Sequence, residues 1–471
     1  MIDSKALREK VLDLAFKGNL VSQNFEDEPA SKLLKRIQKE KEQLIKEKKI
    51  KKEKTLSEIS KKEELYRIPE NWEWTKLGSI IQLISGRDLT KSEYSSLEEG
   101  IPYITGASNF EQGKVKIERW TKHPKVESVK DDILITVKGT VGDMAVLSIP
   151  KAHIARQIVA VRNITKDINS TYLFWFLINY KKKLQQSSKG LIPGITRENI
   201  LEAHIPIPPF AEQQKIVMKI EELFSLIDII EQESAEYDKL TKYLDIKILN
   251  LAMKGKLLPQ DSTDEPASDL LEKIKKEKEQ LINDKKIKKE KNSPKIIEEE
   301  KPYEIPESWE WAKLSWIQDV RDGTHDTPAY IEHGIPLITS KNLINQKICF
   351  KDVKFISSDD ADKIDKRSEV NNGDILFAMI GTIGNPVIVD IGNQRISIKN
   401  VALLKQFSTF NLAEFVHLFL RSQQESMKKN ASGGLQKFYS LTMIRNMIIP
   451  IPPIEEQHRI INAIKEIEKY L

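Results

Sequence analysis

The sequence is poor in the residues that form disulfides and metal sites. Its single cysteine, Cys349, excludes a disulfide framework and any multi-cysteine zinc or iron–sulfur site. The seven histidines are scattered without HxH or HExxH spacing, so we expect no metal. No apolar run approaches the length of a membrane span, and charges interrupt the apolar residues of the N-terminus. We therefore expect a cytoplasmic location and no membrane partner.

Catalytic motifs are equally scarce. The chain has no GxxxxGK[ST] loop for phosphates and no Ser or Cys nucleophile pattern. The segment Pro208, Pro209 and Phe210 is similar to the motif with which amino-methyltransferases hold their target amine, where Asn or Asp precedes Pro-Pro and an aromatic residue. Here Ile207 replaces the polar residue, and no Gly-rich cofactor loop precedes the segment. We expect no catalytic residue and no cofactor in this chain.

Length and composition indicate a multidomain globular protein. A chain of 471 residues suggests two to four domains, and 39% apolar with 31% charged residues is typical of soluble proteins. The 75 basic and 70 acidic side chains leave a net charge of +5. This small excess permits nucleic-acid binding without requiring it.

A regular apolar stripe runs through the centre of the chain, over residues 211–257. From Ile216 to Leu251, eleven positions alternate spacings of four and three residues, and nine of them are apolar. A 3.5-residue period held over five heptads favours a coiled coil over an isolated amphipathic helix. The predicted seam in this segment comprises Ile216, Ile220, Leu223, Ile227, Ile230, Tyr237, Leu244, Ile248 and Leu251.

The chain also contains an internal repeat. The pattern LAxKGxL, then DEPAS, KEKEQLI and IPExWEW, occurs twice at a constant offset of 237 residues. Further on, GIPxIT, GTxG and IPIPP recur at offsets between 234 and 244 residues. The two copies therefore share a framework and differ in loop lengths and in most intervening residues.

The two ends of the chain resemble parts of the central stripe. Residues 454–471 match its first third, and residues 6–20 match its last third. We therefore predict an intramolecular antiparallel coiled coil, with the termini close together and the two copies related by a pseudo-two-fold axis. The ends add six residues to the predicted seam: Leu7, Val11, Leu14, Ile460, Ile464 and Ile467.

Each repeat contains a lysine-rich arm and a domain of mixed structure. The arms, 32–62 and 269–299, begin near DEPAS and are rich in helix formers, and their interleaved glutamates favour a solvated helix over direct DNA contact. Residues 68–210 and 305–453 contain short apolar runs typical of strands, followed by helical stretches at 170–186 and 411–429. IPIPP should end each domain as an extended segment outside the central ladder.

The predicted fold class is α+β, with two pseudo-two-fold-related α+β domains joined by long antiparallel coiled-coil helices. Trp72 and Trp74 alternate as on a strand and are interpreted as core anchors rather than base-stacking platforms. The predicted boundaries are an N-terminal helix 1–25, a first arm 26–67, a first domain 68–210, a central helix 211–258, a second arm 259–304, a second domain 305–453 and a C-terminal helix 454–471.

Polar residues gather in loops of both domains. Arg, Lys, Asn and Gln can pair with base edges in the major groove, whereas Ser, Thr and Lys suit phosphates. The repeated GTxG turns at 139–142 and 381–384 could also cradle phosphate, although a simple turn is the favoured interpretation. The candidates for DNA contact are Arg87, Lys91, Asn109, Lys138, His153, Arg156, Gln157, Lys189 and Arg197 in the first domain, and Arg321, Thr324, His325, Lys341, Asn342, Arg395, Ser397, Lys399 and Lys437 in the second.

The ordered set of paired motifs resembles the specificity subunit of type I restriction-modification systems, over essentially the whole chain. The resemblance implies two target recognition domains, each reading half of a bipartite double-stranded DNA site, and conserved helices that space them. It also implies two modification (adenine methyltransferase) subunits and restriction/translocase subunits as partners, which use S-adenosylmethionine, ATP and Mg²⁺, and no catalysis by this chain itself. The alternatives are a coiled-coil adaptor with protein- or glycan-binding modules and a self-sufficient methyltransferase.

Overall fold

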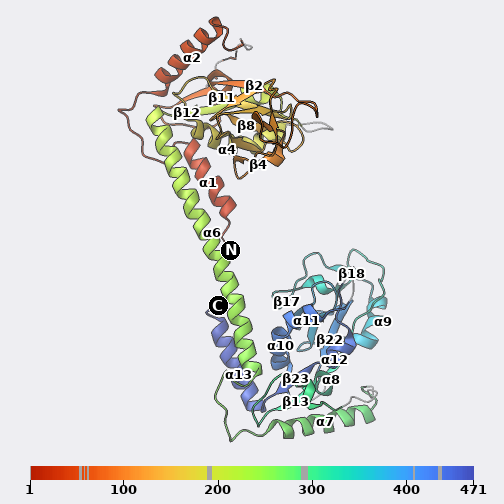
Figure 1. Cartoon of the computed structure of the whole chain (residues 1–471). Helices are drawn as coiled ribbons and strands as arrows, with labels where there is room; N and C mark the ends of the chain where they lie inside the picture. Colours follow the sequence, from red (N-terminus) through yellow and green to blue (C-terminus); the bar gives the residue numbers. More distant parts are fainter. Residues whose placement is uncertain are drawn as a thin grey trace. The chain divides into compact units, whose positions relative to one another are not determined.

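The computed structural model describes residues 2–51, 56–57, 59–60, 63–187, 194–287, 295–406, 409–432 and 437–471 (Figure 1). The chain forms two compact units, unit 1 (Met1–Ala235) and unit 2 (Glu236–Leu471). One helix of 44 residues, α6 (Phe210–Met253), contributes to both units. No helix in the described ranges is long and apolar enough to cross a membrane.

Unit 1 combines helices with short strands. Besides α6, its helices are α1 (Ser4–Phe16), α2 (Ala30–Lys46), α3 (Leu77–Ile80), α4 (Ser170–Ser187) and α5 (Arg197–Leu201), with the 3₁₀ turn η1 (Ala107–Asn109). Its strands are β1 (Glu73–Lys76), β2 (Ile81–Ser85), β3 (Ile101–Ile104), β4 (Phe110–Glu111), β5 (Lys114–Val115), β6 (Trp120–Thr121), β7 (Glu127–Val129), β8 (Ile133–Thr136), β9 (Met144–Val146), β10 (Lys151–Ile154), β11 (Ile158–Asn163) and β12 (His204–Ile207).

Unit 2 has a similar series of elements, with a helix (α9) where unit 1 has the strand β7. Its helices are α7 (Ala267–Asn283), α8 (Leu314–Ile317), α9 (Ser358–Ser368), α10 (Ala413–Ser422), α11 (Gln424–Asn430), α12 (Leu441–Arg445) and α13 (Ile454–Glu468), with η2 (Glu298–Glu300) and η3 (Ser340–Asn342). Its strands are β13 (Glu310–Lys313), β14 (Asp319–Asp322), β15 (Ile335–Ile338), β16 (Leu343–Ile344), β17 (Lys347–Ile348), β18 (Lys354–Ile356), β19 (Ile375–Ala378), β20 (Gly384–Ile388), β21 (Ser397–Ile398), β22 (Val401–Lys405) and β23 (Ile448–Ile451).

Corresponding sheets share most of their strand order in the two units. The main sheet runs β2-β11-β8-β9-β5-β4 in unit 1 and β14-β22-β19-β20 in unit 2, where β16 and β17 form a separate pair. In a second sheet, β3 pairs in parallel with β10, and β15 pairs in parallel with β21. The IPIPP strands β12 and β23 pair only with β1 and β13, in two-stranded sheets. This confirms that the proline-containing segments stay outside the main ladder, because proline lacks a backbone donor.

One face of each main sheet packs against α4 or α10, and the other face forms a smaller buried cluster with the second sheet. In unit 1, Phe16 of α1 meets the rings of Tyr172 and Phe176 edge to face, at centroid distances of 5.4 and 5.6 Å. The hydroxyl of the buried Tyr172 donates to the carbonyl of Pro206 (2.7 Å). The predicted stretch 411–429 is divided into α10 and α11, with Gln423 between them.

Four repeated motifs meet at one junction in unit 1. Gly18 of LAxKGxL ends α1 at φ +72°, and a Cβ there would lie 2.4 Å from Cγ of Pro69 in IPExWEW. Only glycine suits this left-handed position at such close approach. The indole of Trp72 donates to the buried carboxylate of Glu212 in α6 (3.0 Å), and the amide of Ala30 in DEPAS donates to the carbonyl of Asn71 (3.0 Å).

Unit 2 contains the same junction. A Cβ on Gly255 (φ +63°) would again lie 2.4 Å from proline, here Pro306, and Trp309 donates to Glu456 at 2.8 Å. Trp72, Trp74, Trp309 and Trp311 are all buried, which confirms their interpretation as core anchors. The motif spacing in the sequence therefore reflects one packing arrangement that each unit needs.

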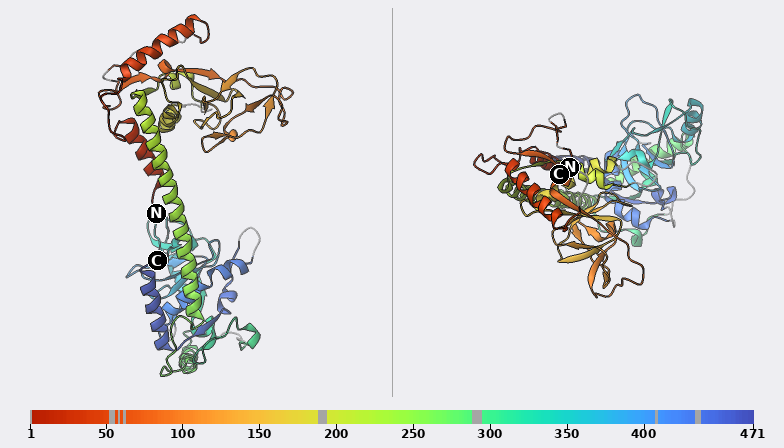
Figure 2. Two further views of the ribbon diagram at one scale, coloured as in Figure 1. Left: turned by 60° about the vertical axis from the view of Figure 1, so that its left-hand side comes forward. Right: turned by 90° about the horizontal axis from the view of Figure 1, so that it is seen from above.

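Each terminal helix runs antiparallel to the part of α6 in its own unit (Figures 1 and 2). In unit 1, Arg8 near the start of α1 pairs with Asp228 and Glu231, while Phe16 at its end shares a core with Ile216 and Ile220. In unit 2, Ile460 and Ile464 of α13 share a core with Ile248 and Ala252, and the last carbonyl of the chain, in Leu471, accepts from the Tyr237 hydroxyl (3.4 Å). The predicted antiparallel pairing is confirmed within each unit.

The predicted seam is buried only towards the ends of α6. Ile216, Ile220, Ile227 and Ile248 are buried and Leu223 is half-buried, but Ile230, Tyr237, Leu244 and Leu251 are exposed. The continuous seam is therefore wrong for these four positions. The partner helices α1 and α13 have 13 and 15 residues, fewer than α6 requires. A straight helix also drifts by about 20° per heptad from a 3.5-residue stripe, so Leu251 lies roughly 100° from Ile216.

The terminal helices and the arms are also shorter or less buried than predicted. Of the six seam residues in the terminal helices, Ile460 and Ile464 are buried, Val11, Leu14 and Ile467 are half-buried, and Leu7 is exposed. The arm helices α2 and α7 have 17 residues each and end where Lys48 (φ 58°) and Lys285 (φ 59°) adopt left-handed conformations. Much of the remaining predicted arm lies outside the described residues.

Candidate nucleic-acid interface

In each unit, the loop that follows the strand β2 or β14 of the main sheet begins with a glycine, and this glycine packs against a second loop. A Cβ on Gly86, after β2, would lie 2.0 Å from the carbonyl oxygen of Ala155, and one on Gly323, after β14, would lie 2.3 Å from that of Ile398. No side chain fits either place. The glycines therefore hold the loops that follow β2 and β14 against the connections β10–β11 and β21–β22.

Side chains from these two loops meet at the same place in each unit. In unit 1, Asp88 accepts from the backbone amide of Arg156 (3.0 Å) and pairs with its Nε (2.7 Å), while the arginine side chain remains 70% exposed. In unit 2, Nδ1 of His325 lies 2.9 Å from Oδ1 of Asn400. We call Asp88–Arg156 and His325–Asn400 the paired loop positions, because each joins corresponding loop residues.

The pair in unit 2 is tied further into the domain. Nε2 of His325 lies 3.0 Å from Oδ2 of Asp322, a carboxylate that is only 6% exposed and also pairs with Arg367 of α9. The histidine therefore links a buried acidic group to the loop surface. Unit 1 instead presents a guanidinium that is oriented by one exposed carboxylate.

Gln157 brings two further loops of unit 1 together with Arg156. Its Oε1 lies 3.0 Å from the place a Cβ would take on Gly106 and 3.8 Å from the corresponding place on Gly139. The turn before η1, the GTVG turn and the β10–β11 connection are therefore neighbours. Lys138 extends from the start of the GTVG turn and is exposed. Four of the sequence segments that were singled out for DNA contact thus converge in unit 1.

Asn109 and Asn342 do not belong to an accessible surface. Oδ1 of Asn109 accepts from the backbone amide and hydroxyl of Thr105 (both 2.9 Å), and its Nδ2 donates to the carbonyl of Lys116 (3.1 Å). Asn342 makes the equivalent bonds to Thr339 and Cys349. Both residues are buried. Their prediction as DNA contacts is corrected: the asparagines close the same turn in both units.

His153 and Ser397 are likewise internal. The ring of His153 is fully buried, with Nδ1 2.8 Å from the carbonyl of Val126 and Nε2 2.8 Å from that of Arg87. Ser397, at the corresponding place on β21, donates to Asp365 of α9 (2.9 Å). Both side chains fasten neighbouring segments to the second sheet, so they are withdrawn from the predicted surface.

Four other predicted contacts are already engaged within their units. Arg197 donates to Ser85 Oγ (2.9 Å), and Arg321 pairs with Asp319 (2.6 Å). Arg395 pairs with Asp362 and Asp365 (both 2.7 Å), and Lys399 donates to Thr327. Contact with DNA would compete with these bonds.

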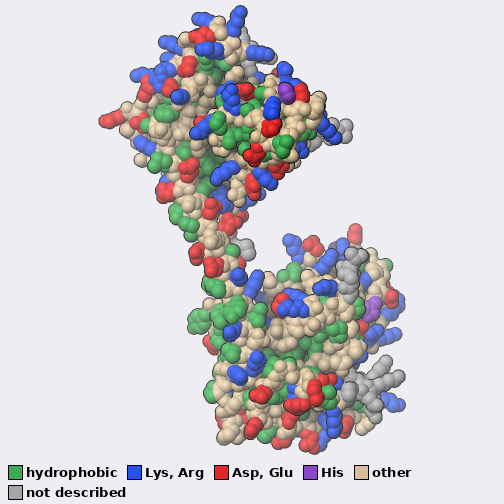
Figure 3. All heavy atoms as spheres, viewed as in Figure 1, with side chains coloured by type: hydrophobic (Ala, Val, Ile, Leu, Met, Phe, Trp, Pro, Cys, Tyr) green, Lys and Arg blue, Asp and Glu red, His purple; other side chains and the backbone are tan. Residues whose placement is uncertain are grey.

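The remaining candidates are open to solvent or outside the described residues. Arg87, Lys91, Lys138, Arg156 and Gln157 are exposed in unit 1, as are His325, Lys341 and Lys437 in unit 2, where Thr324 is half-buried. Lys189 lies outside the described residues. Figure 3 shows basic and acidic side chains interspersed on the visible face of each unit.

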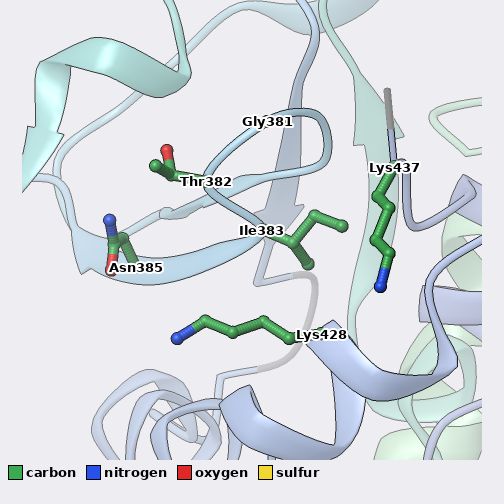
Figure 4. Close-up of a pocket in the computed structure, with 6 residues that line it drawn as sticks. All are labelled: Gly381, Thr382, Ile383, Asn385, Lys428 and Lys437. Carbon is green, nitrogen blue, oxygen red and sulfur yellow. The ribbon is translucent and has the colours of Figure 1, made fainter. Parts of the chain in front are cut away.

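The GTIG turn of unit 2 borders a shallow hollow, which Gly381, Thr382, Ile383, Asn385, Lys428 and Lys437 line. Figure 4 shows Lys437 beside Ile383 and Lys428 below it, and their ammonium groups do not point toward one another. Lys428 also pairs with Glu425 (2.9 Å). Because the two cations do not converge, the hollow favours the interpretation of GTIG as a turn rather than a phosphate cradle.

Sequence reasoning missed several residues of these loops. Asp88 and Asn400 were not among the candidates, although Asp88 directly follows Arg87 and Asn400 directly follows Lys399, which were. Arg445 was also missed. Its guanidinium donates to the carbonyl of Val320 (2.7 Å), whereas Arg197 lies 3.4 Å from the carbonyl of Leu83, the residue that corresponds to Val320. No alignment reveals this match, since the two arginines occupy different positions in the repeat.

Among the residues that the structure describes, no three His, Cys, Asp or Glu side chains are grouped so that they could hold a metal ion. The loop side chains described above make hydrogen bonds and ion pairs. Such groups recognise a partner by the position of donors and acceptors.

Comparison with known proteins identifies the domain that occurs twice. The family described as "Type I restriction modification DNA specificity domain" matches residues 69–237 and 306–471. The chain belongs to this family. One copy of the specificity domain falls largely in each unit, and the resemblance inferred from the paired motifs is confirmed.

Individual specificity subunits match nearly the whole chain. The type I restriction enzyme EcoAI specificity subunit of Escherichia coli is 29% identical over 546 aligned residues, which cover 98% of this chain and 88% of that protein. The EcoEI specificity subunit of Escherichia coli is 27% identical, with coverage of 99% and 89%. The crystal structure of the HsdS subunit from Thermoanaerobacter tengcongensis has a TM-score of 0.52 at 18% identity, covering 86% of this chain and 91% of that one, and supports the fold.

Proposed function

We propose that this specificity protein is the non-catalytic, DNA-reading subunit of a type I restriction-modification complex, and that each unit reads one half of a bipartite duplex site. The observation that carries the proposal is the pair of equivalent loop frameworks. They keep the glycines and the turn-closing asparagines but carry Asp88–Arg156 in one unit and His325–Asn400 in the other. Two frameworks of one design with different polar groups suit two different half-sites.

In this proposal, α6 fixes the separation of the half-sites. At about 1.5 Å per residue, a 44-residue helix is a spacer of roughly 66 Å, which resists compression better than a flexible linker. The gap between the half-sites would then be set by helix length, without any contact to its bases. Joining the two units through one helix also raises the affinity for DNA, because binding by one unit gives the other a high effective concentration at its half-site.

The exposed apolar side chains of α6 suit docking of partner helices. Leu226, Ile229, Tyr237, Leu240 and Tyr243 are between 47% and 61% exposed on this one helix. Exposed apolar groups concentrated in this way are typical of an interaction surface. Two modification subunits, one on each half of α6, would cover them, and restriction/translocase subunits would join that complex. S-adenosylmethionine, ATP and Mg²⁺ would act in the partners, in the cytoplasm.

Selection from random duplex DNA tests the proposal. The full chain, together with its modification partner, is incubated with the pool, and the bound duplexes are sequenced. We expect two short conserved elements separated by a gap of fixed length and free sequence. A single contiguous element, or no enrichment at all, would contradict the proposal.

A further inference from the structure

The arm helices α2 and α7 are equivalent in backbone and in the way they pack. Each buries an alanine, a leucine and an isoleucine: Ala30, Leu33 and Ile37 in α2, and Ala267, Leu270 and Ile274 in α7. Each also sends a lysine back to its own unit, where Lys41 donates to the carbonyl of Gly78 and Lys278 to that of Ser315, both at 2.5 Å. The structural requirements of the two arms are therefore the same.

Their outer faces differ in charge. On α2, Lys32, Lys35, Lys39 and Lys46 are all exposed, and at 100° per residue they fall within an arc of about 60°, opposite the buried residues. We call these four residues the lysine row. It extends along the helix for roughly 21 Å at about 1.5 Å per residue. Arg36, beside the row, is already paired with Glu28 (2.5 Å) and Asp167 (3.2 Å).

The same four places on α7 carry Asp269, Glu272, Lys276 and Asn283. Here the one lysine is paired with Glu272 (2.8 Å). If the outer face of these helices only had to be exposed to solvent, either set of four residues would serve, because α2 and α7 pack against their units in the same way. Solubility and packing therefore do not account for four cations in line on α2 and an acidic excess on α7.

We propose that the lysine row of α2 binds the phosphate backbone of duplex DNA, and that α7 does not. The proposal rests on the function given above and adds a contact outside the reading loops. Lysine ammonium groups are point charges that bind phosphates regardless of base sequence, and a rigid helix fixed to unit 1 holds them in one line. The complex would then bind DNA asymmetrically, because unit 1 would make a non-specific phosphate contact and unit 2 would not.

The salt dependence of binding by the full chain, with its modification partner, tests this contact. In the variant K32Q/K35Q/K39Q/K46Q, the slope of log K against log salt concentration should fall by about 0.9 for each phosphate that is no longer neutralised, and by roughly 3.5 for all four lysines. The enriched half-site sequences should not change. Glutamine has nearly the helix propensity of lysine, so α2 should persist, which circular dichroism checks. The matched control is K273Q/K275Q/K276Q on α7, which should leave the slope unchanged.

Three outcomes would overturn the proposal. If the slope is unchanged in the α2 variant and half-site selection is intact, the lysine row does not contact DNA, and the proposed function is unaffected. A fall of the same size per lysine in the α7 control, which removes three lysines rather than four, would show a general effect of net charge. Weaker association with the modification subunit at an unchanged slope would assign the row to a protein partner. If the unaltered complex selects no duplex sequence, the proposed function itself fails.

Discussion

Units 1 and 2 are alike where the loops are anchored and unlike where the loops end. Gly86 and Gly323 make the same close approach to a carbonyl, and Asn109 and Asn342 close the same turn with the same bonds. The connections β10–β11 and β21–β22 differ, because Arg156 in unit 1 corresponds to Asn400 in unit 2. The shared anchors and the differing polar groups are therefore carried by neighbouring residues, so side chains at the loop ends can change without changing the fold.

The units also differ in a buried helix residue and in an ion pair. Phe174 on α4 corresponds to His417 on α10, and the ion pair of Lys215 with Asp27 corresponds to that of Arg459 with Asp264. These differences allow each unit to be perturbed by itself, so that its stability and its contribution to recognition can be separated.

The largest effect is expected from shortening the helix that both units share. Deletion of one heptad, Ile230 to Glu236, removes about 10 Å of α6, the length of roughly three base pairs at 3.4 Å each. We expect the selected gap between half-sites to shorten, or binding to fail, because the readers stay intact while their separation changes. Selection from random duplex DNA measures both the gap and the half-sites.

A deletion of this size needs a control for folding and for impaired partner binding. Replacing the same heptad by seven helix-forming residues keeps the length of α6 and should restore the original gap. An unchanged gap in the deletion variant would show that α6 does not set the spacing. Altered half-site sequences would show that the two units do not read independently.

The second prediction concerns acid sensitivity, which should differ between the units. His417 donates from Nε2 to the carbonyl of Pro386 (3.0 Å), and burial, aided by nearby Arg421, lowers its pKa to about 4. A depressed pKa means that the neutral histidine contributes stability above its unfolded pKa of about 6.5 and loses it as pH falls toward 4. The shift corresponds to about 3 kcal/mol. Unit 2 should therefore unfold at a higher pH than unit 1.

Substitution H417F, which gives unit 2 the residue found in unit 1, should remove this difference. Thermal unfolding followed between pH 7.5 and 4.5 should show a smaller loss of melting temperature for the variant than for the unaltered chain. If both lose the same amount, charging of His417 is not what destabilises unit 2.

Much of this architecture could be predicted from the sequence because repeated motifs constrain one another. LAxKGxL, DEPAS, IPExWEW and the EQ that follows IPIPP all meet at the junction around Trp72 and Glu212, so their order along the chain reflects a contact in space. The antiparallel pairing followed from the same comparison. The extent of the buried seam could not be predicted in this way. Apolar spacing alone does not tell whether a side chain is buried against another helix of the chain or exposed, as Tyr243 is.

The reading surface was harder to predict for a different reason. Residue type signals an ability to bond but does not tell which partner takes the bond. Asn109 and His153 have groups that could read bases, yet backbone atoms of their own unit satisfy those groups. Arg156 has the same general signal and remains exposed. Only the three-dimensional position of the second loop distinguishes these cases.

The third prediction tests the paired loop positions directly. Asp88 binds Nε of Arg156, and we propose that the arginine contacts a guanine bidentately through its terminal nitrogens. The variant R156A should lose about 1–3 kcal/mol of discrimination at one guanine of the half-site read by unit 1. The other half-site should be unaffected. Binding to duplexes with each base substituted in turn measures this, and D88A should show a weaker loss at the same position.

The matched variant N400A should change only the half-site that unit 2 reads. If R156A instead weakens binding to all sequences equally, the arginine contacts phosphate rather than a base. If it changes the half-site of unit 2, the assignment of half-sites to units is wrong.

The smallest effect is expected at the junctions, where a reciprocal exchange compares the two units. Arg459 binds both oxygens of Asp264, with Nη1 3.1 Å from Oδ1, whereas the ammonium of Lys215 is 3.8 Å from Asp27. The planar fork of arginine suits bidentate pairing, which an ammonium cannot reproduce. We expect R459K to lower, and K215R to raise, the free energy of unfolding by up to about 1 kcal/mol, since both cations are partly solvated. Denaturant titration of each variant measures the change. Equal effects of the same sign would mean that neither ion pair distinguishes the junctions, whereas opposite signs would show that arginine geometry makes the unit 2 junction the firmer one.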